Sequence, residues 1–335
     1  MSRLLTPTSP ITILSSAAVG GYEERRGPFG EALDLTSQDD LFGAATFELA
    51  EAEMARVTLS LALGRCGITE AELGLLLAGD LQNQCVASSQ GPAAGGTPFL
   101  GLFGACSTMV EGLGIGMLAL SGAPGLPSAA AVTSSHNAAA ERQFRTPLEY
   151  GAQRAPTAQW TATAAGAVVL GREGDGGRLE AFLPGRVVDA DITDAANMGA
   201  AMAPAAADTL SAYFRETGER PEDFDLILTG DLGREGSVLL HTLLSEKLPT
   251  LREVHRDAGC LLYDPALQDV HAGGSGCGCI AAMLAGVFLP SVRRGEIRRM
   301  LAVGTGALMN PASLREGGSI AGVAHLVRIG AIENE

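Results

Sequence analysis

The chain has 335 residues, of which 46% are hydrophobic and 18% are charged, so it can bury the core of one large domain or of two smaller ones and is not intrinsically disordered. Its 38 acidic residues outnumber its 23 basic residues, and the resulting net charge of -15 disfavours nucleic acid as a partner. The 44 glycines follow no Gly-X-Y period, so we expect them in tight turns and at close backbone contacts.

The first part of the chain predicts a helix over residues 47–66, ended by Gly67, and then a short buried strand that ends at Gly79-Asp80. A glycine-punctuated apolar stretch follows over 104–120, and strands are predicted over 128–134 and 164–170. The second part repeats this order, with a helix over 204–217, a strand ending at Gly230-Asp231, an apolar stretch over 273–289 and strands over 300–305 and 320–329. Strands that alternate with crossover helices predict right-handed βαβ units and parallel sheets.

The two parts are related in sequence. GITEAELGLLLAGD (67–80) and GERPEDFDLILTGD (218–231) share five of fourteen positions at an offset of 151 residues. We therefore predict two related α/β halves, residues 1–175 and 176–335, with a seam in the polar, glycine-rich stretch 171–185.

Cellular location is predicted from three absences. The six cysteines show neither CxxC motifs nor zinc-ligand spacing, which favours a reducing compartment. The first fifteen residues lack the regions of a signal peptide, so we expect an intracellular protein. Residues 272–292 form a run of 21 uncharged residues, long enough to span a bilayer. Four glycines in its first seven positions favour a buried core helix instead, and no transmembrane segment is predicted.

A duplicated α/β architecture with Cys106 at the start of a buried helix resembles the thiolase and ketoacyl-synthase superfamily, which implies a five-layer αβαβα thiolase-like fold. Within it, six motifs in order resemble the stage V sporulation protein AD family. They are LLLAGDLQNQ (75–84), FGACST (103–108), TSSHNAAAERQFRTPLEYG (133–151), MGAAMAPAAADT (198–209), DLILTGDL (225–232) and AGGSGCGC (272–279).

The resemblance implies a protein that binds dipicolinic acid (pyridine-2,6-dicarboxylate) and takes part in moving it, with calcium, into the developing spore. It also implies integral membrane SpoVA subunits as partners, a peripheral position at the forespore or spore inner membrane, and a homodimer. A calcium chelate is one form in which the ligand would be bound.

Cys106 follows Gly104-Ala105, and the start of a helix would stabilise its thiolate as an acyl-accepting nucleophile. The alternative is a small buried hydrophobic residue. The ketoacyl-synthase branch also needs a histidine after the second-half strand and an asparagine in a GNTS-like turn. Residues 229–231 contain no histidine, and Gly274 stands at the second place. We hypothesise that carbon–carbon bond formation is lost. An acyltransferase or condensing enzyme that uses Cys106 as its nucleophile and a structural scaffold for the membrane partners remain alternatives.

A dianionic ligand needs hydrogen-bond donors, and the stretch 136–145 concentrates them directly after a predicted strand, where ligands bind in open α/β sheets. Arg142 and Arg145 would share one helical face, although Arg142 could instead pair with Glu141 or Glu149. His136 has a claim to the pocket, with a core histidine bonded to backbone as its alternative. The predicted ligand-binding residues are Cys106, Ser134, Ser135, His136, Asn137, Arg142, Arg145, Gly274 and Ser275.

The remaining titratable residues give weaker expectations. His271 is a lesser candidate, His325 fits a core strand, and His241 and His255 lie on polar segments and are predicted to be solvated. Asp80 and Asp231 end equivalent strands, where they would either approach one another or cap the loops that follow. The glycine-rich turns match no nucleotide-binding motif, so no resident metal or cofactor is predicted.

Overall fold

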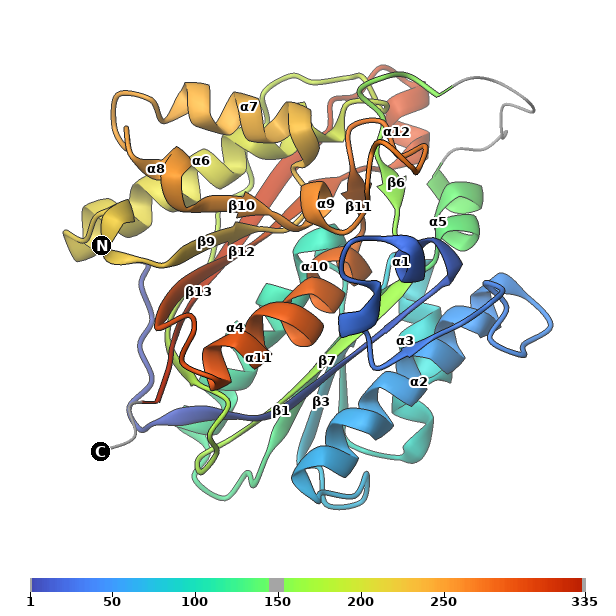
Figure 1. Cartoon of the computed structure of the whole chain (residues 1–335), viewed down its shortest axis with the longest axis vertical. Coiled ribbons are helices and arrows are strands. Elements are labelled where there is room, and N and C mark those ends of the chain that lie inside the picture. Colours follow the sequence, from blue (N-terminus) through green and yellow to red (C-terminus); the bar gives the residue numbers. More distant parts are fainter. Residues whose placement is uncertain (1, 145–153, 333–335) are drawn as a thin grey trace.

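The structure is a computed structural model that describes residues 2–144 and 154–332. Its helices and strands form five layers (Figure 1). Helix α2 packs on one face of the strands β1, β7 and β5, and α4 and α10 lie between these strands and β12 and β13. Helices α6 and α7 pack against each other, and α6 covers the outer side of β12 and β13. The predicted order of layers, αβαβα, is therefore present.

The first part of the chain supplies the following elements. They are β1 (Ile11–Gly20), α1 (Tyr22–Arg26), η1 (Gly30–Ala32), β2 (Leu35–Thr36), α2 (Phe47–Cys66), β3 (Leu75–Gly79), η2 (Asn83–Cys85), α3 (Val86–Gln90), η3 (Pro92–Gly95), β4 (Phe99–Leu102), η4 (Ala105–Ser107), α4 (Thr108–Gly122), β5 (Ala129–Ser135), α5 (Asn137–Phe144), β6 (Trp160–Thr161) and β7 (Ala164–Gly171).

The second part of the chain contains the rest. They are β8 (Arg178–Leu183), α6 (Met198–Thr217), η5 (Pro221–Asp223), β9 (Leu226–Thr229), α7 (Gly233–Leu243), α8 (Leu251–Val254), β10 (His255–Asp257), α9 (Ala258–Leu261), β11 (Gly274–Ser275), α10 (Cys277–Met283), the π-helical turn η6 (Leu284–Phe288), α11 (Leu289–Arg293), β12 (Arg299–Leu308), α12 (Pro311–Arg315) and β13 (Ala321–Gly330).

The strand order makes the internal repeat visible. The large sheet runs β10-β9-β12-β13-β8-β1-β7-β5-β3-β4, with β2 beside β1. From either outer edge inward, two parallel pairs are followed by one antiparallel pair: β4, β3, β5 and β7 at one end, and β10, β9, β12 and β13 at the other. The two parts of the chain therefore share one topology.

The prediction of purely parallel sheets is wrong, because β7 and β13 run antiparallel to their neighbours. The chain passes from β12 to β13 through the short helix α12, which does not cross the sheet as a βαβ helix does. The predicted seam also contains a strand, since β8 lies within residues 171–185 and pairs with β13 and with β1.

Local signals fix the long outer helices. Helix α2 begins after Thr46, whose side chain accepts a hydrogen bond from the Leu49 N–H, and ends at Gly67 in the left-handed conformation. Its bounds match the prediction. Helix α6 begins earlier than predicted, at Met198, because Asn197 caps it and Pro204 is accommodated inside the helix.

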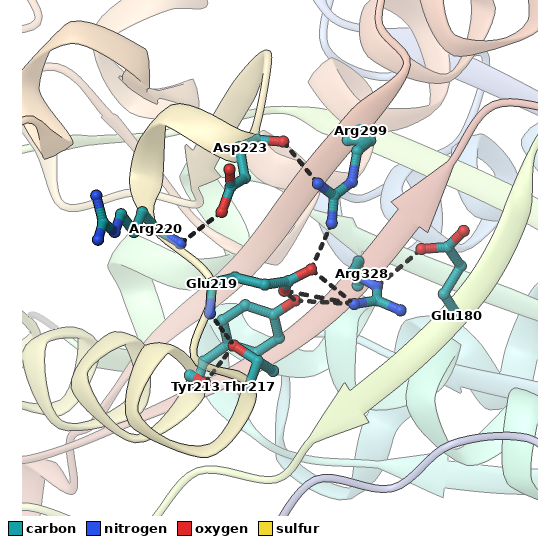
Figure 2. A network of polar contacts seen from close by, with 8 residues as sticks. All are labelled: Glu180, Tyr213, Thr217, Glu219, Arg220, Asp223, Arg299 and Arg328. Atoms are coloured by element: carbon teal, nitrogen blue, oxygen red, sulfur yellow. Dashed lines mark hydrogen bonds and ion pairs between the residues drawn. The ribbon is translucent and has the colours of Figure 1, made fainter.

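The C-terminal end of α6 is fastened to the sheet by a polar network (Figure 2). The Tyr213 hydroxyl donates to Glu219 at 2.6 Å, and Glu219 lies 3.2 Å from the Arg328 guanidinium on β13. Arg328 also lies 2.8 Å from Glu180 on β8, and Arg299 at the start of β12 bonds to Glu219 as well. Charge-assisted contacts of this kind link three strands to one helix.

The two central helices are almost wholly inside the protein. Residues 277–285 are each at most 1% exposed, which confirms the prediction of a buried helix in this uncharged run. The backbones of α10 and β7 touch: a Cβ at Gly278 would lie 2.1 Å from the Ala164 carbonyl oxygen, and one at Gly166 would lie 2.2 Å from that of Ala281. Among the described residues, the stretch Ala105–Gly122 is long and apolar enough to cross a membrane, but 61% of it is buried, as in a core helix.

Candidate functional site

A cavity of about 290 Å³ opens where the carboxyl ends of β3, β5, β9 and β12 meet the start of α4. Open α/β sheets bind their ligands at this end of the strands. The cavity is lined by Leu81, Asn83, Phe103, Ala105, Cys106, Ala140, Glu141, Gln143, Phe144, Thr161, Met198, Ser275, Ala307, Leu308, Met309, Asn310 and Pro311. Most of these side chains are apolar, and a few amide, hydroxyl and carboxyl groups are placed among them, as is usual in small-molecule sites.

Cys106 lies at the inner end of the cavity, as predicted. Ala105 before it adopts a left-handed backbone with φ of 52°, which is uncommon for alanine and turns the chain sharply from β4 into the central helix. The Cys106 Sγ lies 3.9 Å from the Ser275 Oγ, so residues from the two parts of the chain meet here. Burial raises the pKa of the Cys106 thiol well above its ordinary value, and the nearby Asp231 carboxylate raises it further.

The stabilisation of the Cys106 thiolate that we expected from the helix start is therefore outweighed by burial and by Asp231. A helix start lowers a cysteine pKa by a modest amount, whereas complete burial beside a carboxylate acts strongly in the opposite sense. Burial and the neighbouring carboxylate both favour the neutral thiol of Cys106, and the residue is buried, as the alternative of a small buried residue expects.

Asp231 stands immediately after β9 and is fully buried. One of its oxygens accepts hydrogen bonds from the Ser275 hydroxyl at 2.8 Å and the Gly276 N–H at 3.1 Å, and the other accepts from the Thr305 hydroxyl at 2.8 Å. Burial raises the pKa of Asp231, although these donors oppose the rise. Asp231 therefore joins the loop after β9 to β11 and β12 around Cys106.

The residues predicted after β5 do not point into the cavity. Ser134 donates to Glu51 at 3.1 Å and Ser135 to the Ala162 carbonyl at 2.7 Å, and both are buried. His136 bonds through Nε2 to the Asp40 carbonyl at 2.7 Å, and Asn137 donates to the Thr161 carbonyl at 3.2 Å. The core alternative for His136, a histidine bonded to backbone, describes its position.

Arg142 lies on the outer face of α5. It forms an ion pair with Glu48 and lies over the Phe47 ring, 5.6 Å from the ring centroid, and its side chain is 48% exposed. Arg142 therefore takes part in a structural ion pair, and the partner found among the described residues is Glu48 on α2. Arg145 and Glu149 lie outside the described residues.

The two predicted residues of the glycine-rich turn, Gly274 and Ser275, have different positions relative to the cavity. Ser275 lines the cavity, whereas Gly274 contributes backbone, its carbonyl accepting a hydrogen bond from Gln159 at 2.9 Å. A Cβ at Gly274 would lie 2.8 Å from the Tyr263 ring, so glycine allows the ring to pack against the turn.

The sequence reasoning missed the amide side chains of the cavity. Gln143 accepts from the Asn83 N–H at 2.9 Å and donates to the Leu81 carbonyl at 2.7 Å, which joins α5 to the loop after β3. Asn310 caps α12 and lines the opposite wall. The signal was present, since both amides follow predicted strands, but charged residues were weighed above them.

Asp80 and the remaining histidines serve other purposes. Asp80 accepts from the Gln82 N–H at 2.9 Å and from the Ser88 N–H at 2.8 Å, so it caps its own loop. His325 is largely buried, and its ring accepts from the Gly185 N–H at 3.0 Å. His255 is only 5% exposed, so the prediction that it is solvated is wrong.

Within residues 2–144 and 154–332, no group of three or more His, Cys, Asp or Glu side chains is placed to hold a metal ion.

Comparison of the sequence with protein families gives a match over residues 2–330 to the family model of stage V sporulation protein AD. The chain is also 39% identical over 316 residues to stage V sporulation protein AD of Bacillus subtilis (strain 168), a match that covers 94% of this chain and 93% of that protein.

Comparison of the structure finds condensing enzymes. OleA of Xanthomonas campestris bound to cerulenin superposes with a TM-score of 0.61 at 13% identity, over 97% of this chain and 99% of the other. A tetronic acid condensing enzyme gives 0.60 at 18% identity, over 95% and 99%. The 3-oxoacyl-[acyl-carrier-protein] synthase III of Aquifex aeolicus gives 0.56 at 13% identity, over 96% and 99%. At these identities the likeness establishes the thiolase-like fold alone.

Proposed function

This chain belongs to the stage V sporulation protein AD family, and we propose that it binds dipicolinic acid and takes part in its uptake, with calcium, into the developing spore without catalysing a reaction. The observation that carries the proposal is the cavity at Cys106, which keeps the position of a condensing-enzyme site while placing the Asp231 carboxylate beside the thiol.

The surroundings of Cys106 argue against acyl transfer. A nucleophilic cysteine must ionise, and a buried carboxylate next to the sulfur opposes the second negative charge. The loop after β9 offers Asp231 where the ketoacyl-synthase branch requires a histidine, so no neutral imidazole is available to support the chemistry there. The cavity is left as a place to hold a molecule.

The walls of the cavity favour a flat ligand with polar edges. Apolar side chains such as Leu81, Phe144 and Leu308 suit the faces of a pyridine ring, and the amides of Asn83, Gln143 and Asn310 offer donors for carboxylate oxygens. The volume of about 290 Å³ lies at the small end of the usual range for ligand sites, which is about 300–1,000 Å³.

Charge favours the calcium chelate over the free dianion. Among the described residues, none of those that line the cavity is an arginine or lysine, while Glu141 lines it and Asp231 lies behind Ser275. A free dianion would meet these carboxyl groups without a compensating cation, whereas calcium bound between the ligand carboxylates cancels the charge and accepts further oxygen ligands. Arg145, outside the described residues, remains a proposed source of positive charge.

The proposal also includes the assembly of this chain with a second copy of itself and with membrane partners. In the described part of the chain, β4 is one of the two edge strands of the large sheet and pairs only with β3, and Leu100 on it and Phe103 after it are 48% and 53% exposed. An open edge with apolar side chains supports pairing with a second copy of the chain. The proposal further includes SpoVA membrane subunits as partners and a peripheral position at the forespore or spore inner membrane.

Isothermal titration of the full chain with dipicolinate, with and without calcium, tests the proposal. We expect binding that is tighter with calcium, and a loss of at least tenfold in affinity in Ala140→Trp, whose ring would fill the cavity. Arg142→Ala changes an exposed side chain of the same helix and is the matched control; its affinity should stay within about twofold of the wild type. Absence of binding under all conditions, or an unaffected Ala140→Trp variant, would contradict dipicolinate binding in this cavity. Transfer of an acyl group from acyl-CoA at rates typical of the superfamily would refute the non-catalytic part.

A further inference from the structure

A continuous line of polar side chains runs from the outer helix α7 to a buried aspartate in the second part of the chain. His241 Nε2 on α7 lies 3.0 Å from His255 Nδ1, His255 Nε2 lies 2.8 Å from the Thr229 hydroxyl, and that hydroxyl donates to Asp257 Oδ2 at 2.6 Å. Thr229, His255 and Asp257 are at most 5% exposed. Four groups are therefore joined by hydrogen bonds across the outer layer of the protein.

Each hydrogen bond in this line has its donor on the side of His241 and its acceptor on the side of Asp257. Because the Thr229 hydroxyl gives its hydrogen to Asp257, it accepts from His255 Nε2–H. The other ring nitrogen of His255 then lacks a hydrogen and accepts from His241 Nε2–H. Burial lowers the pKa of His255 to about 3, so its ring is neutral and can serve as donor and acceptor at once.

The two ends of the line differ in their surroundings. His241 forms part of the wall of a surface depression of about 230 Å³, where water has access. Asp257 accepts from the backbone N–H groups of Leu232 at 2.9 Å and Gly233 at 3.0 Å, which directly follow Asp231 of the cavity site. Burial, together with the charge of Asp231, raises the pKa of Asp257 to about 7.

We propose that this line carries a proton between the α7 surface and the Asp231–Asp257 pair, and that an anion entering the Cys106 cavity is bound together with a proton taken up by that pair. The inference rests on the proposed function and concerns dipicolinate bound in the same cavity without calcium, as the free anion whose charge no metal ion cancels. A proton on one of these two buried carboxyl groups removes a negative charge from behind the cavity wall at Ser275, and the described lining offers no basic side chain.

The transfer balances without any further reactant. A proton from solvent binds Nδ1 of His241, and the Nε2 proton of His241 passes to Nδ1 of His255. The Nε2 proton of His255 then passes to the Thr229 oxygen, and the original hydroxyl proton passes to Asp257 Oδ2. One proton enters, the carboxylate becomes a carboxylic acid, and both imidazoles end neutral in the other tautomer.

The capping role of Asp257 does not account for this arrangement. Asp257 also accepts from the Cys260 N–H at 3.1 Å and so caps the short helix α9. A cap needs only the carboxyl oxygens and the N–H groups, and two histidines in series add nothing to it. The groups that act electrostatically on the line are Asp231 after β9, Arg234 and His241 on α7, Arg252 on α8, His255 and Arg256 on β10, Cys260 on α9 and Cys279 on α10.

Titration of the full chain with dipicolinate in buffers of different ionisation enthalpy, such as phosphate and Tris, counts the protons exchanged on binding. We expect uptake of about half a proton at pH 7, rising towards one at pH 8, and a fall in affinity of about tenfold per pH unit above pH 7.5. Asp257→Asn mimics the protonated acid and should remove most of the uptake and of this pH dependence. Glu24→Gln is the matched control, since burial also raises the pKa of Glu24 to about 7, but its side chain bonds to Tyr263 and the Thr163 N–H, whereas Asp257 bonds to the N–H groups that follow Asp231.

The route is tested by kinetics. When protein and dipicolinate are mixed in weak buffer with a pH indicator, His241→Ala should slow proton uptake at least several-fold and leave its amplitude unchanged, and added imidazole should restore the rate. A purely structural role of His241 would not respond to imidazole. Binding of dipicolinate with the same enthalpy in all buffers, or with unchanged uptake in Asp257→Asn, would overturn the proton-linked step while leaving dipicolinate binding intact. Complete lack of binding would overturn the proposed function, and this inference with it.

Discussion

The two halves of the molecule place an aspartate at the same point, after the equivalent strands β3 and β9, and use it differently. Asp80 bonds to Gln82 and Ser88, which lie in the loop that it begins. Asp231 bonds instead to Ser275 and Thr305, which are distant in sequence. The first aspartate closes a local loop and the second joins three segments around Cys106. A repeated fold thus fixes where a carboxyl group lies, while its neighbours decide what it does.

Each aspartate also has a second buried carboxyl group nearby. Beside Asp80, Glu51 on α2 accepts from Gln82 at 2.7 Å, and burial with the charge of Asp80 raises the pKa of Glu51 to about 8. Beside Asp231, Asp257 is connected through Thr229 to two histidines. The first pair is bridged by Gln82, whose backbone N–H bonds to Asp80 and whose side chain bonds to Glu51, whereas the second leads to the surface.

The largest effect is expected where the central helices of the two halves pack. A Cβ at Gly278 on α10 would lie 2.1 Å from a backbone oxygen of β7, whereas one at Gly112 on α4 would lie 3.3 Å from the Ala131 side chain. We expect Gly278→Ala to lower the free energy of unfolding by about 3 kcal/mol or more, and Gly112→Ala by less than about 1 kcal/mol because alanine favours the helix. Urea unfolding measures both, and equal losses would contradict the asymmetry.

Removing each aspartate comes next. Asp231→Ala leaves the hydroxyl and N–H donors of two distant segments without an acceptor, and we expect a loss of about 3 kcal/mol in the free energy of unfolding. Asp80→Ala should cost about 2 kcal/mol. Hydrogen exchange separates the two: faster exchange should stay within residues 81–91 for Asp80→Ala, but reach residues 273–277 and 303–307 for Asp231→Ala. Spreading of the Asp80→Ala effect to those distant segments would remove the proposed difference.

The reactivity of Cys106 gives a third test. Its buried thiol should react with iodoacetamide at pH 8 far more slowly than Cys66, which is partly exposed. Asp231→Asn removes the adjacent charge and should raise the rate about tenfold, equivalent to about one pKa unit. Asp80→Asn is the control in the other half and should leave the rate unchanged. Mass spectrometry of the labelled peptide reports both rates; a Cys106 that already reacts like Cys66 would revive the acyltransferase alternative.

The most gradual effect is a dependence of stability on pH. The pKa of Glu51 is raised to about 8 and that of Asp257 to about 7, so both bind protons more tightly in the folded protein than in the unfolded chain. Their stabilising contribution is complete below about pH 4 and is lost as the pH rises through the folded pKa values. From these two groups we expect the free energy of unfolding to fall by about 2 kcal/mol per pH unit between pH 6 and 8.

Single variants show how much of this fall in stability with pH comes from the carboxyl group in each half. Asp257→Asn should remove the part that ends near pH 7, and Glu51→Gln the part that continues to pH 8. Thermal unfolding at several pH values follows both, and a stability that rises over this range would show that the carboxyl groups are ionised in the folded protein.

Much of the fold could be predicted because its signals are local. Thr46 and Gly67 mark the ends of α2, and the two strand-Gly-Asp segments reveal the repeat. The antiparallel course of β7 and β13 could not be predicted, since strand direction depends on how the connecting segments pass over the sheet and not on the strands themselves.

Only part of the site could be predicted, because the side to which a side chain points also depends on distant parts of the chain. Cys106 and Ser275 line the cavity, but His136 turns to the Asp40 carbonyl, and a sequence does not show to which side a polar residue after a strand will point. His255 was expected in solvent because polar residues surround it. In β10, however, polar side chains occupy the buried positions. His255 and Asp257 face inward, because both form hydrogen bonds with the Thr229 hydroxyl, and Arg256 faces out.

The position of α10 has a consequence for how the chain folds. This helix comes late in the sequence, yet it covers the inner face of β5 and β7, which are synthesised much earlier. Until residues 277–283 leave the ribosome, α4 is the only one of the two central helices that can cover that face, and the first half cannot reach its final form alone. Folding must wait for contacts between distant segments, which makes it slow and leaves apolar strands exposed to aggregation. A chaperone that shields the growing chain is expected to raise the yield of folded protein more than it would for a protein whose halves fold separately.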